Sequence, residues 1–196
     1  MRLPFLDRTE ELARLRALFA RREVPFGVSL RDSKRSLYRI ADPFLRFWFR
    51  FVEPNRSRLE ARQIPLVTRK IRTHFAHHVA GVWEDLVRAS IPRRRYFNRT
   101  WGEARSWWGP GQDRSPLELD LVAESADGTA LLLGEVKWTA APALRYPWVA
   151  LQRKANRLAL TEGKQVFLGV WTPTGPGRFG RGVGHFGPQE VLQALR

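Results

Sequence analysis

Acidic side chains interrupt two apolar runs near the middle of this sequence. Residues 117–139 are LELDLVAESADGTALLLGEVKWT, with Asp120 before an Asp-Gly turn signal and Glu135 and Lys137 after it. Side chains alternate across a β-strand, so Glu135 and Lys137 share one face. A hairpin that turns at residues 127–128 brings Asp120 close to that face. The pattern predicts one patch of sheet that carries an Asp, a Glu and a Lys.

Such a patch is suited to metal-assisted hydrolysis of phosphodiesters. Mg²⁺ or Mn²⁺ prefers hard oxygen ligands, and a bound ion polarises a phosphoryl oxygen and lowers the pKa of the attacking water. Lys137 adds a positive charge that can face a phosphate or orient the water. We predict Asp120, Glu135 and Lys137 as catalytic residues, and Asp120 and Glu135 as ligands of the ion. On spacing alone, a cross-strand ion pair neutralised by Lys137 explains the pattern equally well.

Composition limits the class of protein and its partners. The 196 residues carry 34 Lys and Arg against 19 Asp and Glu, a formal net charge of +15, and 43% of them are apolar. That size and apolar content suffice for a folded core, and the charge favours a polyanion, with DNA the expected partner. The absence of cysteine excludes disulfides, thiolate catalysis and Cys-based zinc sites. We find neither a signal peptide nor a membrane-length apolar run, so we expect a cytoplasmic protein with no membrane partner.

Two basic segments are candidates for phosphate contact. Arg93, Arg94 and Arg95 follow Pro92, and Lys34 and Arg35 lie in a polar stretch. Runs of this kind are commonly just solvated, but with this net charge we predict that they contact nucleic acid.

Histidines and tryptophans offer weaker signals. His74 and His78 are four residues apart, but without an H-E-x-x-H pattern we expect a solvated or DNA-facing histidine face and no zinc site. Trp107 and Trp108 could stack on bases, but in a strand-like segment we expect them in the core.

The elements that must position these residues follow from apolar periodicity and from Pro, Gly and capping residues. We predict strands on both sides of the Asp-Gly turn, one or two more within 93–108, a hairpin-like wing within 24–40, and a basic loop over 172–188. The segment 43–53 is rich in aromatics, and we expect a buried helix there and no membrane anchor. The expected helices cover 9–22, 43–53, 66–90, about 147–160 and the last few residues, and a strand covers 165–171.

The order of helix with Glu, strand with Asp, strand with Glu-x-Lys, helix and strand resembles the PD-(D/E)XK nuclease superfamily over about residues 66–171. The matching motifs are LELD with Asp120 and GEVK with Glu135 and Lys137. The resemblance implies an α/β fold with a restriction-endonuclease-like mixed β-sheet core in the order α-β-β-β-α-β. It also implies Glu84, in GVWEDLV, as a further metal ligand. Gln152 and Lys154 would be supporting polar residues.

A second resemblance covers more of the chain. SKRSLYRIADPFLRFWFRFVEPNRS, WEDLV, ELDLVA and GEVKW look like the C-terminal domain, of unknown function, of archaeal-type P-loop ATPases, where a nuclease-like domain follows an AAA-type ATPase and a winged helix. RLPFLDRTEELARLRALFARR resembles the start of that ATPase. The chain has no G-x-x-x-x-G-K-[ST] phosphate loop, so we expect no ATPase activity. The resemblance implies an ATPase core missing between about Arg22 and Glu23.

These observations predict two parts and one principal function. Residues 1–60 would be a helical and winged-helix remnant, and 61–196 the nuclease-like domain. The expected function is that of a DNA-binding nuclease-like domain with Mg²⁺-dependent phosphodiester hydrolysis. The alternative is a catalytically silent nucleic-acid-binding or protein-interaction module. A homodimer and an ATPase acting in trans remain open as further partners.

Overall fold

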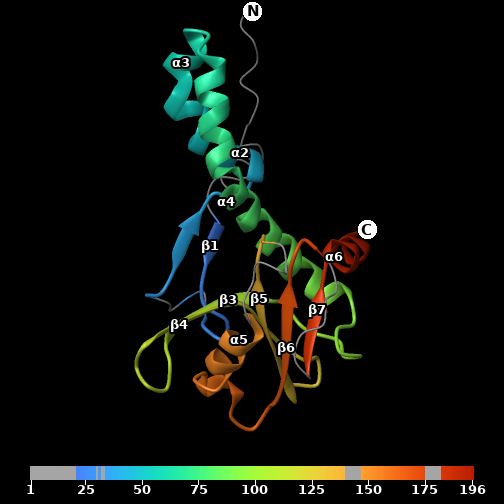
Figure 1. Ribbon diagram of the computed structural model, residues 1–196. Helices are drawn as coiled ribbons and strands as arrows, with labels where there is room; N and C mark the ends of the chain where they lie inside the picture. Colours follow the sequence, from blue (N-terminus) through green and yellow to red (C-terminus); the bar gives the residue numbers. More distant parts are fainter. Residues whose placement is uncertain (1–20, 30, 32–33, 140–146, 175–181) are drawn as a thin grey trace, which may run out of the picture. The chain divides into compact units, whose positions relative to one another are not determined.

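A computed structural model describes residues 21–29, 31, 34–139, 147–174 and 182–196 (Figure 1). The chain divides into two compact units. Unit 1 comprises Met1–Glu23 and Leu30–His78, and unit 2 comprises Val24–Ser29 and Val79–Arg196. Helix α4 (Ile64–Ser90) contributes residues to both units. The division after residue 60 stays a prediction.

Unit 2 is built on a five-stranded mixed sheet in the order β3-β4-β5-β6-β7. The pairs β3–β4 and β4–β5 are antiparallel, whereas β5–β6 and β6–β7 are parallel. The predicted mixed α/β class is therefore confirmed, and the strand at 165–171 has its predicted limits. The strands are β3 (Arg105–Pro110), β4 (Pro116–Glu124), β5 (Ala130–Val136), β6 (Gln165–Trp171) and β7 (Val183–Phe186).

Helices cover both faces of this sheet because its central strands are apolar on both sides. On one face, Trp83 and Val87 of α4 pack in a core with Leu132, together with α6 (Pro188–Leu195). On the other face, Leu151 of α5 (Pro147–Ala155) packs in a second core with Leu133. Alternate residues of β5 thus enter different cores, as the alternation of side chains along a strand requires. The result is a helix–sheet–helix sandwich.

Two glycines let a tryptophan lie close to the sheet. A Cβ atom added at Gly134 would stand 2.6 Å from the Trp171 ring, and one at Gly169 would stand 2.5 Å from it. Trp171 is fully buried. The ring fits because Gly134 of the neighbouring strand β5 and Gly169 of its own strand β6 carry no side chain.

The predicted Asp-Gly hairpin joins β4 to β5. Asp127 accepts hydrogen bonds from the side chains of Ser125 and Thr129, and Gly128 has φ +70°, which a glycine adopts without strain. Hydrogen bonds from the Ser125 and Thr129 side chains and the Thr129 backbone hold the pKa of Asp127 well below its usual range. This turn sets the register that the carboxylates depend on.

Unit 1 is smaller and mostly helical. Strands β1 (Arg21–Glu23) and β2 (Leu37–Arg39) form an antiparallel pair. The Asp42 carboxylate accepts a hydrogen bond from the Leu45 backbone N–H at 2.8 Å and begins the predicted helix. Asp42 is followed by α2 (Pro43–Phe47), the π-helix η1 (Trp48–Val52), the 3₁₀-helix η2 (Glu53–Asn55) and α3 (Arg56–Glu60).

Burial of the aromatic helix was wrongly predicted. Phe51 is 1% exposed, but Phe44 is 64% exposed and Phe49 is 44% exposed. Phe47 and Phe51 lie against the ring of His78, with centroid distances of 5.7 and 5.9 Å. The aromatic helix is apolar on most of its circumference, and one neighbouring helix can cover only one side of it.

Other differences concern the ends of elements. The segment 172–188, predicted as a basic loop, contains β7, and α5 ends at Ala155, short of 160. The predicted helix 9–22 lies outside the described residues, except that Arg21 and Arg22 belong to β1. Short 3₁₀-helices span Ile91–Arg93 (η3) and Ala159–Thr161 (η5). Among the residues described, no helix is long and apolar enough to cross a membrane.

Candidate active site at the ends of strands β4 and β5

The site forms where β4 and β5 separate. Their paired residues run from Glu124–Leu131 to Leu121–Gly134. Beyond that point the Asp120 carboxylate replaces a backbone partner, because its Oδ2 accepts a hydrogen bond from the Val136 N–H at 2.8 Å. Strands β4 and β5 therefore diverge at Asp120.

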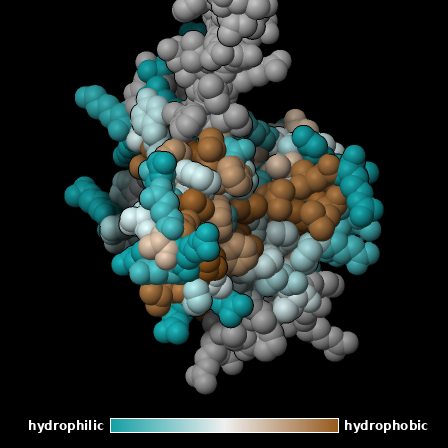
Figure 2. All heavy atoms as spheres, turned by 90° about the horizontal axis from the view of Figure 1, so that it is seen from above, coloured by the Kyte–Doolittle hydropathy of each residue, from teal (hydrophilic) through white to brown (hydrophobic). Residues whose placement is uncertain are grey.

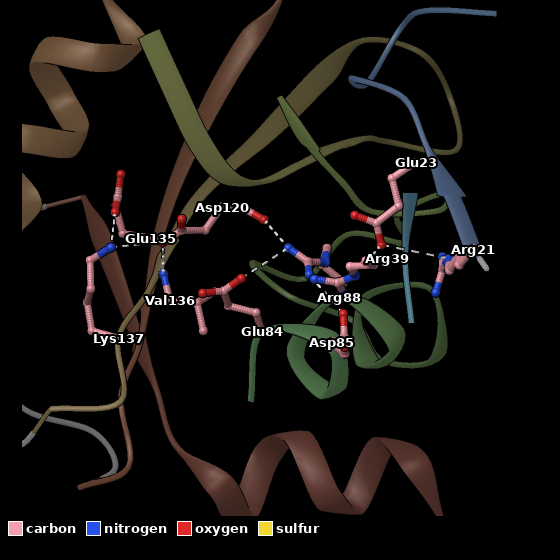
Figure 3. Close-up of polar contacts among 10 residues, drawn as sticks. All are labelled: Arg21, Glu23, Arg39, Glu84, Asp85, Arg88, Asp120, Glu135, Val136 and Lys137. Carbon is pink, nitrogen blue, oxygen red and sulfur yellow. Dashed lines mark hydrogen bonds and ion pairs between the residues drawn. The ribbon is translucent and has the colours of Figure 1, made fainter. Parts of the chain in front are cut away.

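Lys137 joins the two predicted carboxylates. Its Nζ lies 3.0 Å from Oδ2 of Asp120 and 2.7 Å from Oε2 of Glu135 (Figure 3). Lys154 of α5 donates a hydrogen bond to Oε1 of Glu135 from the other side. The Glu135 side chain is only 4% exposed, whereas that of Lys137 is 39% exposed. The structure thus brings together the predicted Asp, Glu and Lys, and it adds the supporting residue Lys154.

The charge of Lys137 is fixed by this arrangement. Burial by itself lowers the pKa of the Lys137 amine, but the charges of Asp120 and Glu135 and the hydrogen bonds to them outweigh it. The pKa of Lys137 is therefore raised above its ordinary value. Lys137 is a cation at neutral pH and cannot accept a proton there.

Helix α4 supplies acids to a neighbouring ion-pair network. Arg88 lies 2.9 Å from Oδ1 of Asp85 and 3.8 Å from Oε2 of Glu84, and its Nη1 donates to the backbone carbonyl of Asp120 at 2.9 Å (Figure 3). Within the described ranges, no three His, Asp or Glu side chains gather closely enough to hold a metal ion. Glu84 is therefore linked to the site through Arg88, and its role as a ligand stays a prediction.

The remaining predicted residues are Gln152 and five basic side chains. Gln152 is exposed on α5 and donates to Asn156 at 3.2 Å. Arg94 donates to Gln193 at 3.2 Å, and Arg95 donates to the backbone carbonyl of Asn98 at 2.9 Å. Arg93, Lys34 and Arg35 are exposed, the last two in unit 1. Contact of these five basic side chains with nucleic acid stays a prediction.

Sequence inspection missed one polar pair on the same face of the sheet. His185 Nε2 lies 2.7 Å from Thr172 Oγ1, and both residues are buried. Glu135 pairs with Val170 across β5–β6, and Val170 pairs with His185 across β6–β7. Because side-by-side residues of parallel strands share a face, His185 lies on the face of Glu135, with one strand between them. No signal in the sequence indicated this pair, because the segment is rich in Gly and Pro and resembles a loop.

A comparison with known families places this fold and site. Residues 48–157 match the family described as Archaea bacterial proteins of unknown function, DUF234. The chain belongs to this family. The match includes Asp120, Glu135, Lys137 and Lys154 but ends before His185.

One curated protein that matches this chain is much longer than the chain. It is the uncharacterized protein MJECL04 of Methanocaldococcus jannaschii, 27% identical over 123 residues. That stretch covers 61% of this chain and 26% of the relative, so the chain spans about a quarter of the relative's length. No solved structure matches the chain. Family membership therefore identifies the kind of domain, and chemistry must be argued from the site.

Proposed function

We propose that unit 2 is a nuclease-like domain of the PD-(D/E)XK type, with a restriction-endonuclease-like sheet, that hydrolyses phosphodiester bonds with a divalent cation. One observation carries the proposal: two carboxylates from different strands converge on a lysine where the strands separate. Carboxylates gathered this way in a basic protein are typical of sites that handle phosphates.

The donor set fits a magnesium or manganese ion. Mg²⁺ is commonly bound by one or two carboxylates and keeps several waters, and Asp120 and Glu135 supply two carboxylates. Asp120 uses Oδ2 for its bonds to Val136 and Lys137, whereas no bond from within the described ranges is made to its Oδ1. Asp120 and Glu135 would hold the ion, which when bound supplies Lewis acidity and an activated water.

The surrounding residues have separate tasks. Lys137, which pairs with both carboxylates, would hold the negative charge of the phosphate or orient the attacking water. Lys154 fixes the orientation of Glu135 through its hydrogen bond. Arg88 donates a hydrogen bond to the backbone carbonyl of Asp120 and thereby fixes the point at which β4 and β5 diverge. His185 and Thr172 add polar groups to the same face.

One observation favours a second candidate, a catalytically silent binding module. Lys137 and Lys154 already neutralise both carboxylates, and Arg88 engages the acids of α4. In that case the acids and lysines form a structural ion-pair network inherited with the fold.

Metal binding and cleavage, measured together, separate the two. Titration calorimetry with Mg²⁺ and Mn²⁺ on the wild type and on Asp120→Asn/Glu135→Gln would be followed by cleavage of plasmid and branched DNA in the same buffers. The nuclease proposal expects ion binding and cleavage that both disappear in the double variant. Glu118→Gln, which removes an exposed acid from the same strand, is the matched control and should behave as the wild type. If the wild type neither binds the ion nor cleaves DNA, the nuclease proposal fails and the catalytically silent module is the remaining candidate.

A further inference from the structure

Positive charge is unevenly divided between the two units. Unit 1 contains 18 Lys and Arg against 8 Asp and Glu, whereas unit 2, which is longer, contains 16 against 11. Within Lys34–His78 the ratio is 11 to 3. The charge excess of the whole chain is therefore concentrated in the unit that does not hold the carboxylate site.

Ion pairs with acids occur in both units, and in unit 1 they include Arg39 with Glu23 and Arg56 with Glu60. Unit 2 neutralises many of its cations with acids: Arg88, Arg99, Arg105, Lys137, Lys154, Arg157 and Lys164 all form ion pairs. In unit 1, four basic side chains at the start of α4 and just before it form no ion pair with an acid in the part of the chain that is described: Arg62, Arg69, Lys70 and Arg72. These four side chains are exposed, and their mutual repulsion is left for a partner to relieve.

Unit 1 also exposes several aromatic rings. Phe44 is 64% exposed, Trp48 39% and Phe49 44%, and Phe75 of α4 is 45% exposed. Apolar side chains lie open at the surface among hydrophilic ones, as Figure 2 shows for one face of the molecule. Phe49 and Arg50 are adjacent in η1 and both are exposed. On α4, Arg72 and Phe75 are three residues apart and therefore on neighbouring positions of the helix surface, so both η1 and α4 carry an exposed ring next to an exposed cation.

We propose that unit 1 binds a single strand of nucleic acid. The basic side chains of α4 would contact phosphates, and the exposed rings of α2 and η1 would stack on unpaired bases. Cations and exposed rings on the same unit suit a single strand, because the cations can follow its phosphates while the rings stack on its unpaired bases. An anionic membrane favours a helix with its apolar and basic groups on separate faces, so that each sits at its own depth. The inference extends the proposed function, since it names where the substrate is held, but its test does not depend on cleavage.

Fluorescence anisotropy over a range of salt concentrations tests the inference. The probe is a labelled thymidine oligonucleotide of about 20 residues, which is longer than a typical single-strand binding site. Arg69→Ala/Lys70→Ala/Arg72→Ala should weaken binding about tenfold or more. It should also reduce the salt slope by about 2, the value for three phosphate contacts on a single strand. Arg114→Ala/Arg153→Ala/Arg196→Ala removes the same charge from exposed positions of unit 2 and should weaken binding by less than about threefold, because few phosphate contacts are lost.

A second variant separates stacking from charge. Phe44→Ala, which removes the most exposed of these rings, should weaken binding about tenfold, as expected for one lost base stack, without changing the salt slope. Equal losses from the two arginine-rich triples would overturn the inference and indicate diffuse attraction to the whole chain. Binding to vesicles of phosphatidylserine and phosphatidylcholine with no binding to the oligonucleotide would also overturn it. If the α4 triple loses binding while the wild type cleaves no DNA, the inference stands and the proposed nuclease activity fails.

Discussion

The two units differ in how far their charged residues are paired. In unit 2, bases outnumber acids by 16 to 11, and many of both form ion pairs, as where Lys137 bridges Asp120 and Glu135. In unit 1, bases outnumber acids by 18 to 8, and aromatic rings such as Phe44 stand in solvent. Unit 2 therefore pairs many of its charges around a packed sheet, whereas unit 1 has the larger charge excess and exposes aromatic area. The difference teaches that the net charge of a chain does not locate its chemistry, because the carboxylate site lies in the less basic unit.

The largest expected effect contrasts a buried with an exposed leucine. Leu132→Ala in the core of unit 2 should lower the free energy of unfolding by about 3 kcal/mol, because a buried side chain is lost and a cavity remains. Leu66→Ala in unit 1, where Leu66 is 53% exposed, should change it by less than about 0.5 kcal/mol. Urea unfolding followed by circular dichroism measures both. Equal costs would contradict the contrast in packing between the units.

Gly134→Ala should destabilise unit 2 by about 2 kcal/mol, because the added methyl group collides with the buried Trp171 ring. Gly102→Ala is the control, since a Cβ there would meet only the Glu124 carbonyl oxygen at 3.5 Å, an ordinary contact. Thermal unfolding compares the two variants. A Gly134→Ala protein as stable as Gly102→Ala would mean that the tryptophan can move aside.

Lys154→Met should lower the free energy of unfolding by about 1–2 kcal/mol, because it removes a hydrogen-bond donor from the buried Glu135 carboxylate. Glu135→Gln/Lys154→Met should cost less than the sum of the single changes, because the two side chains interact directly. Chemical unfolding of the four proteins in this cycle measures the coupling. Strict additivity would show that the contact contributes nothing.

The smallest expected effect is a pH dependence of unit 1. Partial burial, followed by the charges of Arg46 and Arg50, lowers the pKa of His78 below its ordinary value of 6.5. Below pH 6.5 the unfolded chain binds a proton that the folded chain resists, so the free energy of unfolding should fall as the pH falls toward the lowered pKa. NMR titration of the His78 ring checks the pKa. In His78→Gln, the loss of stability between pH 7.5 and pH 5 should be smaller than in the wild type; an equal loss would exclude His78 as its source.

Turn residues and the alternation of side chains made much of unit 2 predictable from the sequence. Asp127 and Gly128 predict the hairpin because their turn requires a left-handed residue, and the alternation around Glu135 predicts its shared face with Lys137. Unit 1 was predicted less well. The apolar sequence of residues 43–53 suggests a buried helix. Burial depends on how many other elements pack around the helix, and Phe44 and Phe49 have too few packing neighbours to be buried.

Spacing along one or two neighbouring elements was enough to predict the capped helices, the hairpin, the mixed α/β class and the convergence of Asp120, Glu135 and Lys137. The other contacts of the site depend on how the elements pack. The tertiary structure brought Lys154 from α5 to Glu135, linked Glu84 to the site through Arg88, and placed Thr172 and His185 on the same sheet face. These contacts join residues that are distant in the chain, and a sequence pattern does not specify which distant side chains meet.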